Sequence, residues 1–440
     1  MTRARRTAID QTTPATSPAT TRRRQRAIAI FTLLFFGFSA LAAVPVSAAE
    51  APVSIDVLTI NDFHGHTEAN GSAAGAAVLA GAVNQFRDTG NTLFVSAGDN
   101  IGASPFTSAF QDDAPTLDVL NEIGLDASAV GDYEFDQGRA DFDDRVIPAA
   151  DFPYLSANVY DRPTGQPAFE QYVVKEIDGI SVGFIGALTR QLPTLVNAAG
   201  VASLEVRDTV TEVNRVAADL HDGDAVNGEA DVVILLLHEG AATGRIDSAT
   251  NDSAFARIVA ETAPSVAAIV SAHTHQRYSH SLPAAGSVLS RPVIQAGDDG
   301  RILGHLALTV DLASHELLSI SGGLLPLFDD LQDPKYAPDP AVAAVVAAAT
   351  AVADPVGVTG VSPVLDTYRP GQEIRLRLSS LLMTDGERVT PEVTAHFGRD
   401  GVALSPASFF PFDDSIVDGT DETGVAPTWL SPCRRMPKAD

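Results

Sequence analysis

Cysteine is nearly absent from this chain of 440 residues, since Cys433 is the only one. A single thiol excludes an internal disulfide framework, even in a compartment that would permit disulfides. Positive charge is also scarce: 29 Lys and Arg residues stand against 56 Asp and Glu residues, which gives a formal net charge of −27. A surface this negative argues against binding to nucleic acid, which needs basic patches. It also repels phosphate esters, so such a substrate would need local positive charge, for example from metal ions.

The first 50 residues are predicted to be a targeting segment rather than part of the fold. Four arginines between residues 22 and 26 are followed by an apolar run from Ala27 to Ala43 and by a small-residue cleavage site at Val46-Ser47-Ala48. We therefore expect a signal peptide over residues 1–48 and a mature protein that is secreted or held at the cell surface, with no membrane span after cleavage. The alternative is a retained membrane anchor, because the apolar run is nearly long enough to cross a bilayer.

The region from Val53 to about Leu325 alternates short apolar runs with helical stretches, which predicts a layered α/β domain over residues 51–325. Hydrophobic residues make up 45% of the chain, enough for a substantial core. A hairpin is expected around Asp178-Gly179. The helical stretches are Ala73–Arg87, Thr116–Ile123, Thr209–Leu220 and Asp252–Glu261, and the hairpin strands are Tyr172–Ile177 and Ile180–Ile185.

The C-terminal part of the chain differs in character. Residues 326–355 are predicted to be a linker that contains a helix over Ala341–Val352, which is too short to span a membrane. Residues 356–440 read as short strands with polar turns, including Thr384-Asp385-Gly386-Glu387. We expect a small β-rich module there, with its last dozen residues disordered.

Five polar clusters stand where apolar runs end. The runs read as buried strands because they are short, continuous and rich in Val, Ile and Leu. They are Val53–Ile60, Thr92–Ala97, Ala127–Val130, Val232–Leu237 and Ala267–Val270. The clusters are Asp62-Phe63-His64, Gly98-Asp99-Asn100, Gly131-Asp132-Tyr133-Glu134-Phe135-Asp136, His238-Glu239-Gly240 and His273-Thr274-His275. Catalytic groups of open α/β sheets gather past the carboxyl ends of strands, so these carboxylates and imidazoles predict a divalent-metal site.

The spacing within the clusters suggests how metal is held. Asp62 and His64 are two residues apart, and in an extended chain both side chains would project to one side and grip one ion. His273 and His275 repeat this spacing. Asp99 is suited to bridge two ions because a carboxylate has two oxygens. Taken singly, each cluster has an ordinary alternative, such as a solvated loop, a turn or a capping histidine, but all five in this order favour a two-metal site.

The chain resembles the calcineurin-like metallophosphoesterases, and within them the secreted bacterial 5′-nucleotidases and related UDP-sugar and cyclic-nucleotide hydrolases. The matching stretches are Asn61-Asp62-Phe63-His64-Gly65-His66, Gly98-Asp99-Asn100-Ile101-Gly102-Ala103-Ser104, Ser156-Ala157-Asn158-Val159 and Ala272-His273-Thr274-His275. The resemblance implies a four-layer α/β/β/α sandwich over residues 51–325. It also implies two divalent ions, drawn from Mn, Zn, Fe, Co or Mg. The implied ligands are Asp62, His64 and His275 for the first ion, Asp132, His238 and His273 for the second, and Asp99 between them.

The third cluster departs from the family pattern Gly-Asn-His-Glu-Phe-Asp. Asp132 replaces an amide ligand with a carboxylate, which adds negative charge facing the phosphate. Tyr133 replaces the histidine that, with the aspartate at position 136, assists the transferring phosphoryl group or the leaving oxygen. A phenol can donate a hydrogen bond but carries no positive charge. Because losing a positioned acid costs about 10²–10⁴ in rate, we expect a slowed enzyme with Tyr133 and Asp136 as its catalytic residues.

A second departure concerns substrate binding. In the secreted nucleotidases a nucleoside-binding domain follows the linker helix, and most of it is expected to be missing here, which predicts weak and relaxed specificity. The predicted function is that of an exported hydrolase of nucleotides or similar phosphate esters. Its main rival is a non-catalytic relative that binds metal or ligand, which Asp132 and Tyr133 favour. A truncated product that folds poorly is the third reading.

Overall fold

The computed structural model describes residues 51–70, 73–329 and 333–359, together with four short strands between residues 373 and 396. The predicted signal peptide and most of the predicted module at 356–440, including its last dozen residues, lie outside the described residues. Within the described part of the chain, no helix combines the length and the apolar character that crossing a bilayer requires.

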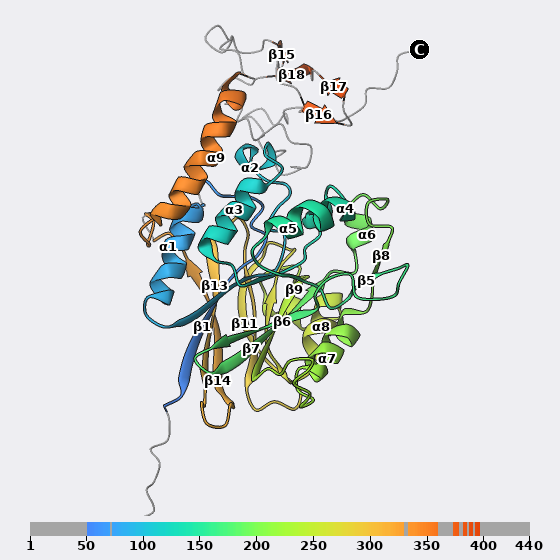
Figure 1. The fold of residues 1–440 in the computed structure, drawn as a ribbon, viewed down its shortest axis with the longest axis vertical. Coiled ribbons are helices and arrows are strands. Elements are labelled where there is room, and N and C mark those ends of the chain that lie inside the picture. The colour runs from blue at the N-terminus through green and yellow to red at the C-terminus, as the bar shows by residue number, and fades with distance from the viewer. Residues whose placement is uncertain are drawn as a thin grey trace, which may run out of the picture. The chain divides into compact units, whose positions relative to one another are not determined.

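Two six-stranded sheets form the centre of the domain (Figure 1). The first has the order β14-β13-β1-β2-β3-β4, where β1 is Val53–Ile60, β2 Asn91–Ser96, β3 Ala127–Ala129, β4 Tyr154–Leu155, β13 Ile302–Val310 and β14 Leu317–Pro326. The second has the order β11-β12-β10-β9-β7-β6, where β6 is Tyr172–Ile177, β7 Ile180–Leu188, β9 Val232–His238, β10 Val266–Ser271, β11 Arg277–Pro283 and β12 Ser290–Ala296.

The strands that lead to the polar clusters are parallel within each sheet. β1 to β4 run parallel in the first sheet, and β7, β9, β10 and β12 run parallel in the second. All seven residues of β9 are buried, as expected for a continuous apolar strand covered on both faces. The predicted hairpin is present, since β6 and β7 pair antiparallel across Asp178 and Gly179, whose φ angles of 50° and 82° suit a tight turn.

Three apolar clusters separate four layers. One lies between the two sheets and contains Val57, Val95 and Val270. A second joins the first sheet to helices on its outer face, and a third joins the second sheet to helices on the opposite face. The predicted α/β/β/α sandwich is therefore confirmed.

The main helices begin within three residues of their predicted positions. They are α1 (Ala76–Arg87), α3 (Ala114–Ile123), α7 (Thr209–Asp219) and α8 (Ala254–Glu261). The largest difference is at α1, predicted from Ala73, because Gly75 has a φ of 80° that a right-handed helix cannot contain. The starts of α7 and α8 are fixed by Asp208 and Ser253, whose side chains accept hydrogen bonds from backbone N–H groups two residues inside each helix.

Helix α9 (Pro340–Thr359) is longer than the predicted Ala341–Val352 and continues through Pro355. Its start is capped by Asp339, whose carboxylate accepts hydrogen bonds from the backbone of Ala341 and Val342 at 2.8 and 2.9 Å. The helix packs against α1, α3 and the short helix α2 (Phe106–Ala109), and therefore against the main domain.

Shorter elements complete the described chain. They are α2 (Phe106–Ala109), α4 (Arg139–Asp141), α5 (Ile147–Ala149), α6 (Leu192–Leu195), 3₁₀ turns at Tyr133–Phe135 and Ile246–Ala249, a π turn at Phe142–Val146, and the paired strands β5 (Val159–Asp161) and β8 (Leu204–Val206). In the C-terminal part, β15 (Glu373–Arg377) pairs with β18 (Glu392–His396), and β16 (Leu382–Thr384) with β17 (Glu387–Val389).

Candidate metal centre

The predicted ligands converge at the edge of the domain where parallel strands of both sheets end. Three aspartates follow β1, β2 and β3 of the first sheet, and histidines end or follow β9 and β10 of the second. Seven side chains form two groups, and within each group the ligand atoms lie within 4.8 Å of one another. One group is Asp99, Asp132, His238 and His273; the other is Asp62, His64 and His275. The sharing of Asp99 between two ions stays a prediction.

The four-residue group is the more buried one. His238 Nε2 lies 3.0 Å from Asp132 Oδ1 and 3.1 Å from Asp99 Oδ2. His273 Nδ1 approaches the same Asp132 oxygen at 3.0 Å. The departure at position 132 therefore places a carboxylate in contact with both histidines of this group.

The three-residue group lies beside it. His64 Nε2 is 3.3 Å from His275 Nε2, which is 3.6 Å from Asp62 Oδ1. Both Asp62 oxygens also accept the backbone N–H of His273, at 3.0 and 3.1 Å. The two groups are thus joined through the backbone of one ligand and the side chain of another.

The prediction that these ligands stand two apart on extended chain was wrong. Asp62 and His64 have φ angles of 48° and 47°, and His273 and His275 have 70° and 53°. Left-handed backbone is rare outside glycine, although Asp, Asn and His tolerate it best, and each instance costs about 1–3 kcal/mol. Here the turns interlock, because Asp62 N–H and His64 N–H donate to the carbonyls of Gly98 and Asp99 at 3.0 and 3.1 Å.

Two glycines allow the loops to approach this closely. A Cβ atom on Gly131 would lie 2.1 Å from Asp99 Oδ1, and one on Gly98 would lie 2.8 Å from His238 Nδ1. Any side chain at these positions would displace a candidate ligand. This requirement accounts for the Gly-Asp pairs at 98–99 and 131–132.

Two histidines are oriented by backbone carbonyls. Nδ1 of His64 lies 2.9 Å from Gly102 O, and Nδ1 of His238 lies 2.9 Å from Ala97 O. When Nδ1–H donates this hydrogen bond, Nε2 carries the lone pair of the neutral ring and faces the other candidate ligands. The geometry therefore presets both rings for metal binding.

Glu134 organises the loops, a role that the sequence did not suggest. Its side chain is 2% exposed and accepts the backbone N–H groups of Asp99, Asn100 and Gly131 at 3.1, 2.8 and 2.7 Å. Burial and the nearby Asp99 carboxylate raise the pKa of Glu134 to about 8. The signal available in the sequence was its place inside the third polar cluster, between Tyr133 and Phe135.

The charge of the centre favours cations. Asp62, Asp99 and Asp132 are 0%, 1% and 4% exposed. Burial raises the pKa of Asp62. For His238, burial lowers the pKa, but the neighbouring carboxylates of Asp99 and Asp132 outweigh this effect and raise the pKa of His238 well above its usual value. Buried carboxylates require counter-charge, and mixed oxygen and nitrogen donors suit Mn, Fe, Co or Zn. The donor set therefore fits divalent metal ions.

Tyr133 and Asp136 lie beside the centre without belonging to either group. The Tyr133 ring meets the His64 ring edge-on with centroids 4.9 Å apart, and a Cβ on Gly102 would lie 2.9 Å from Asp136 Oδ2. Burial and the Asp99 carboxylate raise the pKa of Tyr133 to about 12. The phenol therefore stays protonated at neutral pH.

Other polar residues near the matching motifs have structural partners. Buried Asn158 bonds the backbone of Leu188 through both ends of its amide, at 2.8 and 2.9 Å. Arg190 is an exposed residue, 3.7 Å from Asp208. His66 Nε2 lies 3.1 Å from Asp299 Oδ1, and Glu68 accepts hydrogen bonds from Thr107 and Thr350.

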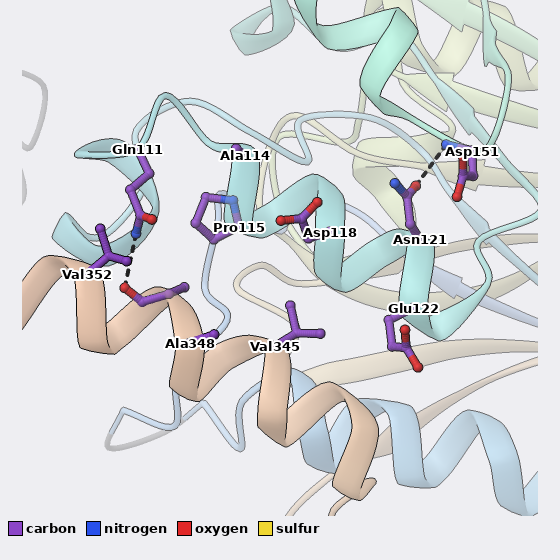
Figure 2. A pocket seen from close by; sticks show the side chains of 11 residues that line it. Gln111, Ala114, Pro115, Asp118, Asn121, Glu122, Asp151, Val345, Ala348 and Val352 are labelled. Carbon is purple, nitrogen blue, oxygen red and sulfur yellow. Dashed lines mark hydrogen bonds between the residues drawn. The ribbon is translucent and has the colours of Figure 1, made fainter.

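A separate cleft of about 620 Å³ lies between α3 and α9 (Figure 2). Val345, Ala348 and Val352 of α9 face Asp118 and Glu122 of α3 across it. None of its lining residues belongs to either ligand group. The cleft therefore lies outside the candidate metal centre.

Comparison with known proteins agrees with this centre. The sequence model of calcineurin-like phosphoesterases matches residues 55–277, which include all seven side chains. Endonuclease YhcR of Bacillus subtilis is 25% identical over 338 residues, 70% of this chain and 26% of the relative. Cell wall protein Lmo0130 of Listeria monocytogenes is 29% identical over 316 residues, which are 62% of this chain and 39% of the relative. A 5′-nucleotidase of Vibrio vulnificus is 29% identical over 198 residues, which are 44% of this chain and 35% of the relative. The chain spans between about a quarter and two-fifths of the length of these relatives.

Solved structures share the fold. Calcineurin-like phosphoesterase YfkN of Bacillus subtilis superposes with a TM-score of 0.55 at 22% identity, covering 69% of this chain and 98% of that one. A 5′-nucleotidase precursor of Thermus thermophilus superposes with a TM-score of 0.55 at 21% identity, covering 69% of this chain and 59% of that one. At these identities the likeness establishes the fold alone.

Proposed function

Because this chain belongs to the calcineurin-like phosphoesterase family, we propose that it hydrolyses phosphate esters with two divalent metal ions. The observation that carries the proposal is the convergence of seven side chains, from loops of two different sheets, into two adjacent ligand groups. We assign Asp62, His64 and His275 to the first ion and Asp132, His238 and His273 to the second. Asp99 is assigned to both.

The proposed chemistry divides between the ions and the chain. When bound, two divalent ions polarise the phosphoryl group, activate water for in-line attack and reverse the local sign of the acidic surface. The interlocked turns and Glu134 hold the ligands in place. We assign Tyr133 and Asp136, which lie beside the centre, to hold a proton for the leaving oxygen.

The substitutions in the third cluster are proposed to slow the reaction. Asp132 adds negative charge beside Asp99 and His238, and this charge opposes an incoming phosphate. Tyr133 offers a hydrogen bond without the positive charge of an imidazolium. Since accelerations of phosphate monoester hydrolysis reach about 10²¹, a loss of about 10²–10⁴ leaves a working enzyme.

The substrates are proposed to be nucleotides or similar small phosphate esters outside the cytoplasm. The relatives named 5′-nucleotidase support the substrate class, and the relative named a cell wall protein supports the location. The targeting segment predicted at 1–48 supports export. Turnover of nucleotides far above that of a simple aryl phosphate would contradict the relaxed specificity that we expect.

A non-catalytic metal-binding protein is the second candidate, and Asp132 and Tyr133 are the observations that favour it. Purified protein assayed with and without Mn²⁺ or Zn²⁺ against a nucleoside monophosphate, an aryl phosphate, a phosphodiester and DNA separates the two. Chelator-sensitive hydrolysis that is lost in Asp99→Asn supports the enzyme. Retention of two metal equivalents without hydrolysis of any ester supports the binder.

A further inference from the structure

The turn between β12 and β13, residues 297–300, brings an acidic side chain to the outer side of one candidate ligand. Asp298 Oδ2 lies 3.5 Å from His275 Nδ1. The other ring nitrogen of His275 faces inward, 3.3 Å from His64 Nε2 and 3.6 Å from Asp62 Oδ1. The imidazole thus stands between the Asp298 carboxylate and the three-residue ligand group.

We propose that Asp298 is a positioning residue that orients His275 so that its Nε2 binds the first metal ion. This inference rests on the proposed function, because it assigns a support to one ligand of that centre. A carboxylate behind a ligating histidine fixes the tautomer and makes the ring a stronger donor.

His275 needs such a support more than His64 and His238 do. Its side chain is 42% exposed, whereas that of His238 is fully buried. His64 and His238 each place Nδ1 2.9 Å from a backbone carbonyl. Among the described residues, the Asp298 carboxylate is the polar group that occupies this position for His275.

The turn that carries Asp298 is fastened to the loop of Asp62. The amide of Asn61 donates to Gly297 O at 2.5 Å and accepts from Ala296 N–H at 2.9 Å. The backbone N–H of Asp299 donates to Asp62 O at 2.8 Å. Asp298 is therefore held in a fixed place relative to the ligand group that His275 joins.

Arg301 donates a hydrogen bond to each of the two acidic side chains of the turn. Its Nη1 lies 3.0 Å from Asp298 Oδ1, which leaves Oδ2 for His275, and its Nη2 bonds the carboxylate of Asp299. Asp299 turns instead to His66, at 3.1 Å. Of the two aspartate side chains, the one that contacts the side chain of a candidate ligand is therefore Asp298, whereas Asp299 contacts Asp62 through its backbone N–H.

The variant Asp298→Asn tests the assignment through metal affinity. Titration of Mn²⁺ into metal-free protein by calorimetry is expected to show two equivalents for the wild type. In the variant one equivalent should bind about 10–100-fold more weakly, the usual cost of losing such a support, and the other should be unchanged. Asp299→Asn, in the same turn, is the matched control and should bind both equivalents like the wild type. Asp298→Ser serves if Asp298→Asn does not fold.

A double variant separates the positioning role of Asp298 from a purely structural one. If Asp298 acts through His275, then Asp298→Asn should cause no further loss of Mn²⁺ affinity in a His275→Ala background, and excess Mn²⁺ should restore turnover of Asp298→Asn. Wild-type affinity in Asp298→Asn, or an equal loss with and without His275, would overturn the inference alone. A wild-type protein that bound no Mn²⁺ would overturn the proposed function with it.

Discussion

The imidazole of His238 lies 3.1 Å from the carboxylate of Asp99, although His238 ends a strand of the second sheet and Asp99 follows a strand of the first. Both side chains are almost fully buried, at 0% and 1% exposure. The candidate metal centre therefore joins the two halves of the sandwich, and a metal ion bound there would link the two sheets.

Removing metal is expected to destabilise the fold. Without cations the buried carboxylates of Asp62, Asp99 and Asp132 face imidazoles and uncharged N–H donors. Each ion present at 100 times its dissociation constant stabilises the protein by about 2.7 kcal/mol. Melting curves recorded after exhaustive chelation and again after adding Mn²⁺ should differ by several degrees. Identical curves would show that the centre does not bind Mn²⁺ in the folded protein.

Glu134→Gln should weaken metal binding although Glu134 is not assigned as a ligand. The amide NH₂ would face the backbone donors of Asp99 and Gly131, and an unsatisfied buried group costs about 1–3 kcal/mol. We expect Mn²⁺ affinity to fall about 10–100-fold with a lower melting temperature. Glu212→Gln, which changes another buried glutamate bonded to Tyr160 and Arg215, is the control and should keep its metal affinity.

The fold was largely predictable from the sequence because its strands are apolar runs. β1 matches its predicted bounds, and the predicted runs before Asp99, Asp132, His238 and His273 correspond to β2, β3, β9 and β10. The end of the last helix was predicted less well, because α9 continues to Thr359, through Pro355 and past the predicted end at Val352. A proline alone does not decide where a well-packed helix ends.

The site was predictable in its members but not in its shape. Residue types and order indicated the seven side chains, whereas the left-handed backbone at Asp62 and His64 lies where their N–H groups bond the carbonyls of a distant loop. The supports could not be recognised for the same reason. Glu134 lies inside a motif that gave it no role, and Asp298 meets His275 only after the chain passes from the second sheet back to the first.

The double variant Asp132→Asn, Tyr133→His is expected to raise turnover. It removes a negative charge beside the phosphate site and restores an imidazole in place of a phenol, a change worth about 10²–10⁴ in rate if the group acts as an acid. Steady-state assays on an aryl phosphate at saturating Mn²⁺ measure it. Turnover equal to that of the wild type would show that these two departures do not limit the reaction.

Arg291→Met should destabilise the second sheet. The guanidinium, 2% exposed, donates to the carbonyls of Val266, Ala263 and two further residues at 2.6–3.1 Å. Burial lowers the pKa of Arg291 to about 10, so it is charged at neutral pH. Several buried carbonyls would lose their partner, at about 1–3 kcal/mol each where no water replaces it.

Denaturant unfolding monitored by circular dichroism measures this loss. Arg87→Met is the matched variant, because Arg87 also binds two carbonyls but one of these bonds is exposed. Its loss should be clearly smaller. Equal losses in the two variants would contradict the importance of burial at Arg291.

Anomalous diffraction from crystals soaked in Mn²⁺ tests the central assignment most directly. We predict two peaks, one among Asp99, Asp132, His238 and His273 and one among Asp62, His64 and His275. A map with no peak at either group would contradict the account.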